Sequence, residues 1–378
     1  MRGTHFTDLH EHIILEILCF LTAKFIIRCS CVCKDWAKLI YQPYFTHVYL
    51  SKRKAPLQLV LEKNNNLVLA TLDENLYIDT SPHNILVPSE LIFDLNIRRF
   101  FDVQPSVCLE IFTCKVTGWI LATDQAPYSY LGKEYECQPY HIYNPITGQH
   151  IVVEKVKRAD IEWSSCALIF AEKTNQLKLL GFYSRKGSRR LEADVQTIGS
   201  NAWRSIGATP CDREGCELPV LLNGHCHWLD CDKAVVNCFD SEKEVFQVIQ
   251  TPPGFMHYMS NNNINFSNIG SVNGCLCLSV GSMGNEHNSF ELWVMNKYGN
   301  QDSWIKKYVL YDLRIFYPGA LLEPLTCLEN GEILMLWDRS TLILGDAKTN
   351  STMICYNPQL NKYRYFMFDE VTLSERNA

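Results

Sequence analysis

The N-terminal 45 residues carry more apolar helical surface than so short a segment can bury within itself. Between residues 8 and 45, apolar side chains recur in three successive stretches at spacings of one, three and four, as in amphipathic helices. Chains of fewer than about 40 residues rarely sustain a core without a disulfide, a bound metal or a partner. The excess apolar face therefore needs another surface, either the rest of this chain or a second protein.

Residues that can cap helices precede the first two stretches. Asp8 is expected to cap the first helix, with Glu11 three residues later, and Thr22 can cap the second. Pro43 is expected to end the third, because proline lacks an N–H group and its ring clashes with the preceding turn. The apolar positions of the three helices are Ile13, Ile14, Ile17, Leu18 and Leu21, then Ile26 and Ile27, then Val32, Trp36, Leu39 and Ile40. An ordinary helical cap on a larger domain would show the same pattern.

The composition is that of a folded protein, and its charges divide the chain into a basic head and an acidic body. Of the 378 residues, 12% are aromatic and 20% are charged, which is typical of a well-packed globular protein. The net charge of −6 is unevenly divided, because residues 1–54 hold eight Lys and Arg against four Asp and Glu. A basic head suits an acidic docking partner, and an acidic body argues against general binding to nucleic acid.

The sequence predicts neither a membrane span nor an export signal. The apolar stretch over residues 13–21 is shorter than the roughly 18–20 residues that a spanning helix needs, and Glu16 interrupts it. Seventeen cysteines are an odd number in a long chain, which favours reduced and mostly buried thiols over a disulfide framework. We therefore expect a protein of the cytoplasm, the nucleus or both, with no membrane partner.

Beyond residue 47 the pattern changes to short runs of β-branched and aromatic residues, bounded by Gly, Asn, Pro or Asp. No strong long helical period follows, so the body is predicted to be all-β. The predicted strands include residues 57–61, 66–71, 142–143, 151–153, 177–182, 220–222, 234–239 and 244–249.

A weak internal repeat runs through these strands. Turns such as Asn223-Gly224 and Asn273-Gly274 precede apolar strands, and both residue types tolerate the positive φ that tight hairpins need. The repeat of roughly 40–55 residues is the period of propeller blades rather than of helical solenoids. The candidate blades are residues 48–105, 106–155, 160–208, 216–252, 266–310 and 322–368. About six blades are therefore predicted, with seven as the other count and a pair of β-sandwiches as the other architecture.

The head also follows a gapless residue pattern that includes the element Val32-Cys33-Lys34 followed by Trp36. The residues of the pattern are Leu9, Ile17-Leu18, Leu21, Ala23-Lys24, Arg28, Cys31-Val32-Cys33-Lys34, Trp36, Leu39-Ile40, Pro43 and Phe45. This pattern resembles a plant F-box. The resemblance implies three helices that bind the small Skp-type adaptor of a Skp–cullin–F-box ubiquitin ligase. The residues at the family's adaptor-facing positions are Leu9, Ile17, Leu21, Ile26, Val32, Cys33 and Trp36.

Two residues depart from the family's pattern. His10 and Thr22 stand where the family usually has proline. Proline at a first helical position fixes φ and gives up only an N–H group that would lack a partner anyway. Thr22 can compensate by capping, whereas His10 is expected within the first helical turn, where a protonated ring opposes the helix dipole. We expect weaker adaptor binding, not its loss.

The body carries a second, more diffuse resemblance. The matching segments are Tyr143-Asn144-Pro145, Trp203-Arg204-Ser205-Ile206, residues 220–228 and residues 236–246. They are similar to the kelch-like F-box-associated domain of plant proteins, which implies a β-propeller. The predicted organisation is an F-box over residues 5–47 and a propeller over residues 48–370.

The clusters of reactive side chains favour structural roles over a metal site or catalysis. Five residues are close in sequence, but their spacing fits no common zinc pattern: Cys211, Cys216, His225, His227 and Cys231. His225 and His227 are expected on one face of a strand, as core or packing residues. The chain has no nucleophile elbow, phosphate-binding loop or His-Glu-x-x-His motif, so we expect no catalysis, metal or cofactor. The basic segment 185–190 is interpreted as a hairpin loop, with contact to phosphates or an acidic partner as the alternative.

Together these features favour a substrate-recognition subunit of a Skp–cullin–F-box ubiquitin ligase. The head would dock to the adaptor, and through it to a cullin–RING ligase. The propeller would hold an unidentified target protein for ubiquitination. The alternative is a non-ligase scaffold or ligand-sensing propeller protein with a weakened F-box, which His10 and Thr22 favour.

Overall fold

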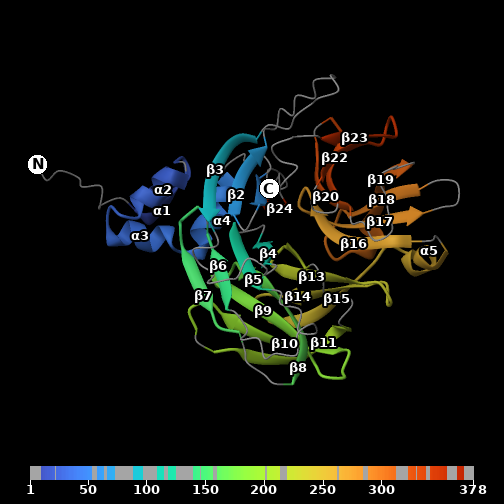
Figure 1. Ribbon diagram of the computed structural model, residues 1–378, viewed down its shortest axis with the longest axis horizontal. Helices are drawn as coiled ribbons and strands as arrows, with labels where there is room; N and C mark the ends of the chain where they lie inside the picture. Colours follow the sequence, from blue (N-terminus) through green and yellow to red (C-terminus); the bar gives the residue numbers. More distant parts are fainter. Residues whose placement is uncertain are drawn as a thin grey trace, which may run out of the picture.

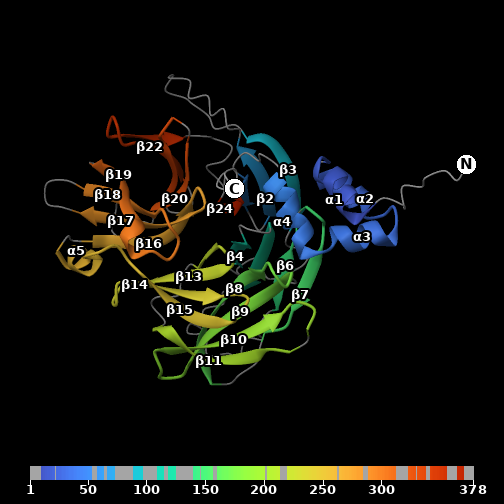
Figure 2. The same cartoon turned by 180° about the vertical axis from the view of Figure 1, so that it is seen from behind.

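The protein consists of a small helical head at one side of the molecule and a larger body of β-sheets (Figure 1, Figure 2). The computed structural model describes residues 10–21, 23–52, 58–63, 66–72, 88–96, 109–114, 118–124, 139–144, 146–155, 160–200, 202–212, 219–261, 264–283, 288–311, 322–328, 330–337, 341–355 and 364–369. Within these ranges, no helix is long and apolar enough to cross a membrane.

Four helices form the described part of the head, residues 10–52. They are α1 (Glu11–Cys19), α2 (Ala23–Cys29), α3 (Lys34–Ile40) and α4 (Pro43–Lys52). The three predicted helices are present, and α4 is a fourth that the sequence pattern does not predict. The third helix ends at Ile40, before Pro43 as predicted, but Pro43 also begins a further helix, because its missing N–H group costs nothing in the first turn. The predicted domain boundary at residue 47 consequently falls inside a helix.

The start of α1 also differs from the prediction. Its N-cap is His10, with an extended backbone (φ −61°, ψ 141°) and no side-chain cap hydrogen bond. His10 thus precedes the first helical turn instead of lying within it. Asp8 and Thr22, the two predicted caps, lie outside the described residues. The cap of α3 is Cys33, whose Sγ accepts a hydrogen bond from a backbone N–H group at 3.5 Å.

The described part of the body contains six four-stranded antiparallel sheets, five of which are built from four consecutive strands. The first two of these five contain β4 (Leu109–Cys114), β5 (Trp119–Asp124), β6 (Tyr140–Tyr143) and β7 (His150–Val153), then β8 (Ile161–Ala171), β9 (Gln176–Arg185), β10 (Arg190–Thr197) and β11 (Arg204–Asp212). The next contains β12 (Val220–Leu222), β13 (His225–Asp230), β14 (Val235–Asp240) and β15 (Val245–Gln250). The last two contain β16 (Ile264–Val272), β17 (Cys275–Met283), β18 (Asn288–Met295) and β19 (Trp304–Tyr311), then β20 (Leu322–Cys327), β21 (Ile333–Trp337), β22 (Thr341–Asp346) and β23 (Ser351–Cys355).

The remaining sheet joins the two ends of the body. It combines β1 (Gln58–Lys63), β2 (Asn66–Leu72) and β3 (Pro88–Asn96) with β24 (Arg364–Asp369). Strand β24 pairs antiparallel with β1, with Val60 opposite Phe366. The candidate repeat 322–368 is therefore wrong at its end, because its last strand belongs to the first sheet. This pairing satisfies an edge of β1 that would otherwise expose unpaired backbone groups.

Each predicted strand overlaps a strand of the structure, and the predicted Asn-Gly hairpins are confirmed. Asn223-Gly224 connects β12 to β13 with φ values of 51° and 70°, and Asn273-Gly274 connects β16 to β17 with 49° and 71°. Positive φ at both central residues is the geometry that favours these residue types in tight hairpins. The body is all-β in class, as predicted, and its described part also holds a short helix, α5 (Phe255–Asn261), between β15 and β16.

The core of the body lies between neighbouring sheets. Phe182 of β9 meets Trp228 of β13 edge to face, with ring centroids 4.9 Å apart and planes at 81°. Similar apolar clusters join the sheet β4–β7 to β8–β11, β12–β15 to β16–β19, and β16–β19 to β20–β23. Neighbouring sheets therefore bury apolar side chains against one another, as in repeat architectures.

Candidate functional site

One face of the head packs into the body. Strands β5 and β6 contribute Ile120, Ala122 and Tyr143 to a shared core, and the turn after β6 contributes Ile146. The buried head residues of this core are Ile14, Leu18, Cys19, Ile26, Leu39, Ile40, Phe45, Val48 and Tyr49. Both views show α4 against the sheets (Figure 1, Figure 2). The body thus covers part of the apolar surface that the head cannot bury by itself, and this burial stabilises the packing of the head against the body.

A buried polar contact fixes the head at the turn between β6 and β7. The Nδ2 of Asn144 donates to the Oγ1 of Thr46 in α4 at 2.8 Å, and both residues are fully buried. The Oδ1 of Asn144 accepts from the backbone N–H groups of Ile146 at 2.9 Å and Thr147 at 3.1 Å. One side-chain amide therefore closes its own turn and also holds α4. A buried polar group that loses its partner is costly, so the contact specifies where α4 sits.

A second sheet contacts α4 through the turn between β8 and β9, residues 172–175. The Oδ1 of Asn175 accepts from the backbone N–H of Tyr44 at 2.8 Å. The Nε2 of His47 lies 3.4 Å from the carboxylate of Glu172. The head is therefore held by two neighbouring sheets, β4–β7 and β8–β11.

Several large apolar side chains of the head stay exposed outside the shared core. We call the following residues the outer face, with their exposed fractions: Ile13 46%, Ile17 38%, Phe20 84%, Phe25 49% and Val32 66%. Ile13, Ile17 and Phe20 are four and three residues apart along α1 and its C-cap, so they share one side of that helix. Apolar side chains gathered on an exposed face are typical of an interaction surface.

The predicted adaptor-facing residues with exposed or half-buried side chains include Ile17, Val32, Leu21 and Trp36. Ile17 and Val32 belong to the outer face. Leu21 and Trp36 are half buried and pack against the shared core. A substitution at either of these two positions would therefore disturb the head as well as any interface.

The other three predicted residues are placed differently. Ile26 is fully buried in the shared core, so its side chain is not available to a partner. The prediction for Ile26 does not fit the structure, because α2 turns this position toward the core. Cys33 uses its thiol as the cap of α3, and Leu9 lies outside the described residues.

The histidines of the sequence cluster on β13 serve the contact between two sheets. His225 and His227 lie on one face, as predicted, with ring centroids 6.2 Å apart. Burial lowers the pKa of His227 to about 4, so its ring is neutral near pH 7. The ring nitrogens of His227 then pair with the carbonyl of Val220 at 3.0 Å and the hydroxyl of Tyr298 at 2.7 Å. Within the described residues, which omit Cys216, no three His, Cys, Asp or Glu residues are arranged to hold a metal ion.

The remaining sequence clusters also have structural positions. Cys211 is buried between two sheets, and Cys231 is exposed in the turn after β13. The basic segment is a hairpin between β9 and β10, as interpreted. At its base, Arg185 pairs with Glu192 and Asp160, which neutralises part of its charge.

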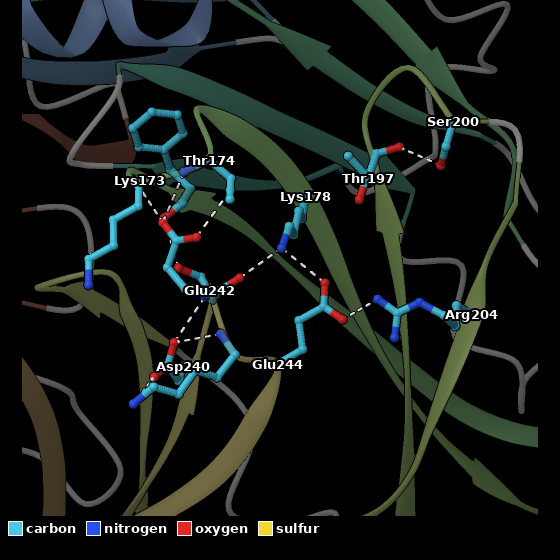
Figure 3. Close-up of polar contacts among 12 residues, drawn as sticks. Lys173, Thr174, Lys178, Thr197, Ser200, Arg204, Asp240, Glu242 and Glu244 are labelled. Carbon is cyan, nitrogen blue, oxygen red and sulfur yellow. Dashed lines mark hydrogen bonds and ion pairs between the residues drawn. The ribbon is translucent and has the colours of Figure 1, made fainter.

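The turn between β14 and β15 fastens its sheet to β8–β11, as Figure 3 shows. Glu242 accepts from the backbone N–H of Lys173 at 2.5 Å and from the hydroxyl of Thr174 at 3.1 Å. The hydroxyl of Ser241 donates to the carbonyl of Phe170 at 3.0 Å. The turn 172–175 is therefore held on one side by α4 and on the other by Glu242.

A buried ion pair strengthens the same junction. The Nζ of Lys178, which is 4% exposed, lies 2.9 Å from Glu244, and Arg204 pairs with the same carboxylate (Figure 3). Burial by itself raises the pKa of Glu244. Hydrogen bonds from Arg204 and Lys178 outweigh it and hold the pKa below its ordinary value of 4.5. Glu244 is thus a carboxylate at neutral pH.

Two stacked histidines lie on the sheet that seats the head. His141 of β6 and His150 of β7 have ring centroids 5.2 Å apart, and the Nδ1 of His141 is 3.0 Å from the Nε2 of His150. Burial, together with the neighbouring His150, lowers the pKa of His141 to about 4. Burial also lowers the pKa of His150. Both rings are therefore neutral at pH 7, where two positive charges so close would repel.

Curated relatives are F-box proteins of Arabidopsis thaliana. One is 22% identical over 366 residues, which is 91% of this chain and 81% of the relative. A second is 24% identical over 280 residues, or 60% of this chain and 61% of the relative. F-box protein DOR is 24% identical over 339 residues, or 86% of this chain and 79% of that protein.

Two families match the two parts of the chain. Residues 6–48 match the F-box domain, and residues 133–372, more than half of the chain, match the F-box associated beta propeller domain. The chain is a plant F-box protein. Its F-box is the helical head, and its propeller is the β body.

Sequence reasoning missed the residues that seat the F-box on the propeller. Asn144 is prominent in the sequence as part of an Asn-Pro turn, and that signal predicts only its local hydrogen bonds. Its partner Thr46 is 98 residues away along the chain, so no local pattern joins the two. The contact of Asn175 with Tyr44 spans 131 residues and has no sequence signal either.

Proposed function

We propose that this F-box protein is the substrate-recognition subunit of a Skp–cullin–F-box ubiquitin ligase. The observation that supports the proposal most is the outer face of the F-box. The propeller covers the inner face of the four helices and leaves this second apolar face exposed to a partner. An apolar surface of this kind on a small helical domain suits the Skp-type adaptor that F-boxes bind, and the adaptor would connect the chain to a cullin–RING ligase.

Apolar burial is the main source of affinity in this proposal. Fully burying a Val, Leu, Ile or Phe side chain contributes about 1.5–3 kcal/mol. Phe20 and Val32 have the most surface left to bury, so they are expected to dominate the docking energy. Leu9, Leu21, Cys33 and Trp36 are retained as proposed adaptor-binding residues, whereas Ile26 is fully buried in the shared core.

The propeller is proposed to hold the target protein. The sheets of the body would be its kelch-like blades, with β24 closing the ring against β1. The domain boundary is kept at residues 47 and 48, with α4 running across it. In this role the chain acts by proximity and orientation of target lysines, without bond-making chemistry, metal or cofactor. Its expected compartment is the cytoplasm, the nucleus or both.

Co-purification with a plant Skp-type adaptor tests the proposal. Val32→Asp places a charge on the outer face, and it is expected to weaken adaptor binding about tenfold or more, because an interfacial charge would lose its water. Since Val32 is 66% exposed, the substitution should leave the free protein folded. The control is Val248→Asp on β15, an exposed valine of the propeller that is 49% accessible. The proposal would be wrong if Val32→Asp bound the adaptor as tightly as the wild type and the Val248→Asp control do.

A second candidate function is a non-ligase scaffold or ligand-sensing propeller protein. The observation that favours it is the start of α1, where His10 occupies the N-cap without a side-chain cap hydrogen bond. A weakly started α1 would hold Ile13 and Ile17 less firmly. Wild-type affinity for the adaptor decides between the two functions. A micromolar or weaker dissociation constant would support the scaffold.

A further inference from the structure

The F-box has no complete core of its own among the described residues. Its buried helical residues form one cluster with Ile120, Ala122, Tyr143 and Ile146 of the propeller. A helical segment of about 40 residues is below the size at which a core alone usually suffices. The sheet β4–β7 therefore contributes part of the apolar core on which the helices α1–α4 depend.

The inner and outer faces of the F-box belong to the same helices. In α1, Ile14 and Leu18 are buried in the shared core, and Ile13 and Ile17 are exposed one position before each of them. A rotation or loss of α1 would displace both sets together. The geometry of the outer face therefore depends on how the F-box helices pack against the propeller.

Directional contacts strengthen this dependence. Thr46 receives the amide of Asn144 inside the buried interface. Tyr44 is held through its backbone by Asn175, in the turn that Glu242 fastens to the next sheet. Apolar contacts alone would allow α4 to slide on the sheet, whereas these hydrogen bonds define one position.

We propose that the F-box is a conditional module whose outer face is formed only while the propeller sheet β4–β7 is folded. A chain with a misfolded target-binding propeller would then fail to dock to the adaptor. Only the identity of the partner rests on the function proposed above. In this mechanism Asn144 is a positioning residue that acts on the docking surface through Thr46, without touching the partner.

Hydrogen exchange of the full-length protein, read by mass spectrometry, tests the proposal. Asn144→Ala is expected to speed exchange in α1, α3 and α4 by about tenfold, in parallel with β6 and β7, and to weaken adaptor binding about fivefold. Thr46→Val removes the same hydrogen bond from the F-box side at nearly constant volume. If Asn144→Ala folds poorly, Thr46→Val provides the same test and should give the same exchange pattern. The double variant should differ little from either single variant, because both substitutions remove the same hydrogen bond.

The matched control destabilises the propeller far from the F-box. A Cβ on Gly345 of β22 would lie 2.7 Å from Leu310 Cδ1 and 2.9 Å from Met335 Cε, so Gly345→Ala must strain that part of the core. This variant is expected to speed exchange in β21 and β22 and to leave α1–α4 and adaptor affinity within about twofold of wild type.

The two proposals fail in different ways. Faster exchange in β6 and β7 of the Asn144→Ala and Thr46→Val variants, with unchanged exchange in α1–α4, would overturn the conditional module. Absence of adaptor binding by the wild type would instead overturn the ligase function, and the exchange pattern would still decide whether the helices depend on the sheet.

Discussion

The indole Nε1 of Trp203 donates a hydrogen bond to the backbone carbonyl of Glu154 at 3.0 Å, across the junction between the sheets β8–β11 and β4–β7. Trp304 repeats this relationship, donating to the carbonyl of Gln250 at 2.9 Å. Each tryptophan stands at the start of the fourth strand of its sheet and reaches the end of the fourth strand of the preceding one. A tryptophan thus joins successive sheets at two places in the body.

Removing either indole donor should therefore weaken a junction between blades. Trp203→Phe and Trp304→Phe each lose one hydrogen bond, and each should lower the free energy of unfolding by about 1 kcal/mol. Gly181→Ala probes the same junction, because its Cβ would lie 3.2 Å from the ring of Trp203, which must shift by a few tenths of an ångström. Urea denaturation measures the three effects. Unchanged stability of both tryptophan variants would mean that these hydrogen bonds contribute nothing net.

The ion pair at the β14–β15 turn predicts an asymmetric response to substitution. Glu244→Gln leaves Lys178 buried without a carboxylate, which should cost about 3 kcal/mol or more. Lys178→Met should cost less, because Glu244 keeps Arg204 as a partner. The two midpoints of urea denaturation give the order directly. If Lys178→Met lowered the free energy of unfolding more than Glu244→Gln does, Lys178 would not depend on Glu244 in this way.

The stacked histidines predict loss of stability in mild acid. An unfolded histidine has a pKa near 6.5, whereas the pKa of His141 in the native protein is about 4. Between these values the unfolded chain binds more protons, so the free energy of unfolding falls as the pH is lowered from 6.5 toward 4. The slope for one proton is at most about 1.4 kcal/mol per pH unit.

The histidine prediction is checked by urea denaturation at pH 7, 6 and 5. His141→Gln should flatten the dependence on pH, with a residual slope from His150 and His227, whose pKa values are also lowered. His257→Gln, at an exposed position of α5, serves as the matched substitution for comparison. An identical slope in wild type and His141→Gln would refute the prediction.

Phe20 should contribute to adaptor binding although the family resemblance does not select it. It is 84% exposed and shares a side of α1 with Ile13 and Ile17. Phe20→Ser should weaken adaptor binding by about 1–2 kcal/mol without changing the free energy of unfolding. Tyr311→Ser, at an exposed position of β19, serves as the control in isothermal titration. Unaltered affinity in Phe20→Ser would place this residue outside the interface.

Local patterns predicted most of the secondary structure and the two-part organisation. The helical period placed α1–α3, and the Asn-Gly pairs placed two hairpins, because both signals arise between residues that are neighbours in sequence. Pro43 shows the limit of such reasoning. The same residue can stop one helix or begin the next, and only the packing of Phe45, Val48 and Tyr49 into the shared core shows that α4 exists.

The sequence by itself determined that the N-terminal segment carries excess apolar surface, and that this surface needs the rest of the chain or a second protein. The tertiary structure decided how that surface is divided. The propeller takes the face with Ile14, Leu18 and Ile26, and the face with Phe20 and Val32 stays exposed. It also decided that β24 completes the first sheet. These outcomes depend on side chains and strands far apart in the chain, where shape and burial, not spacing, choose the partners.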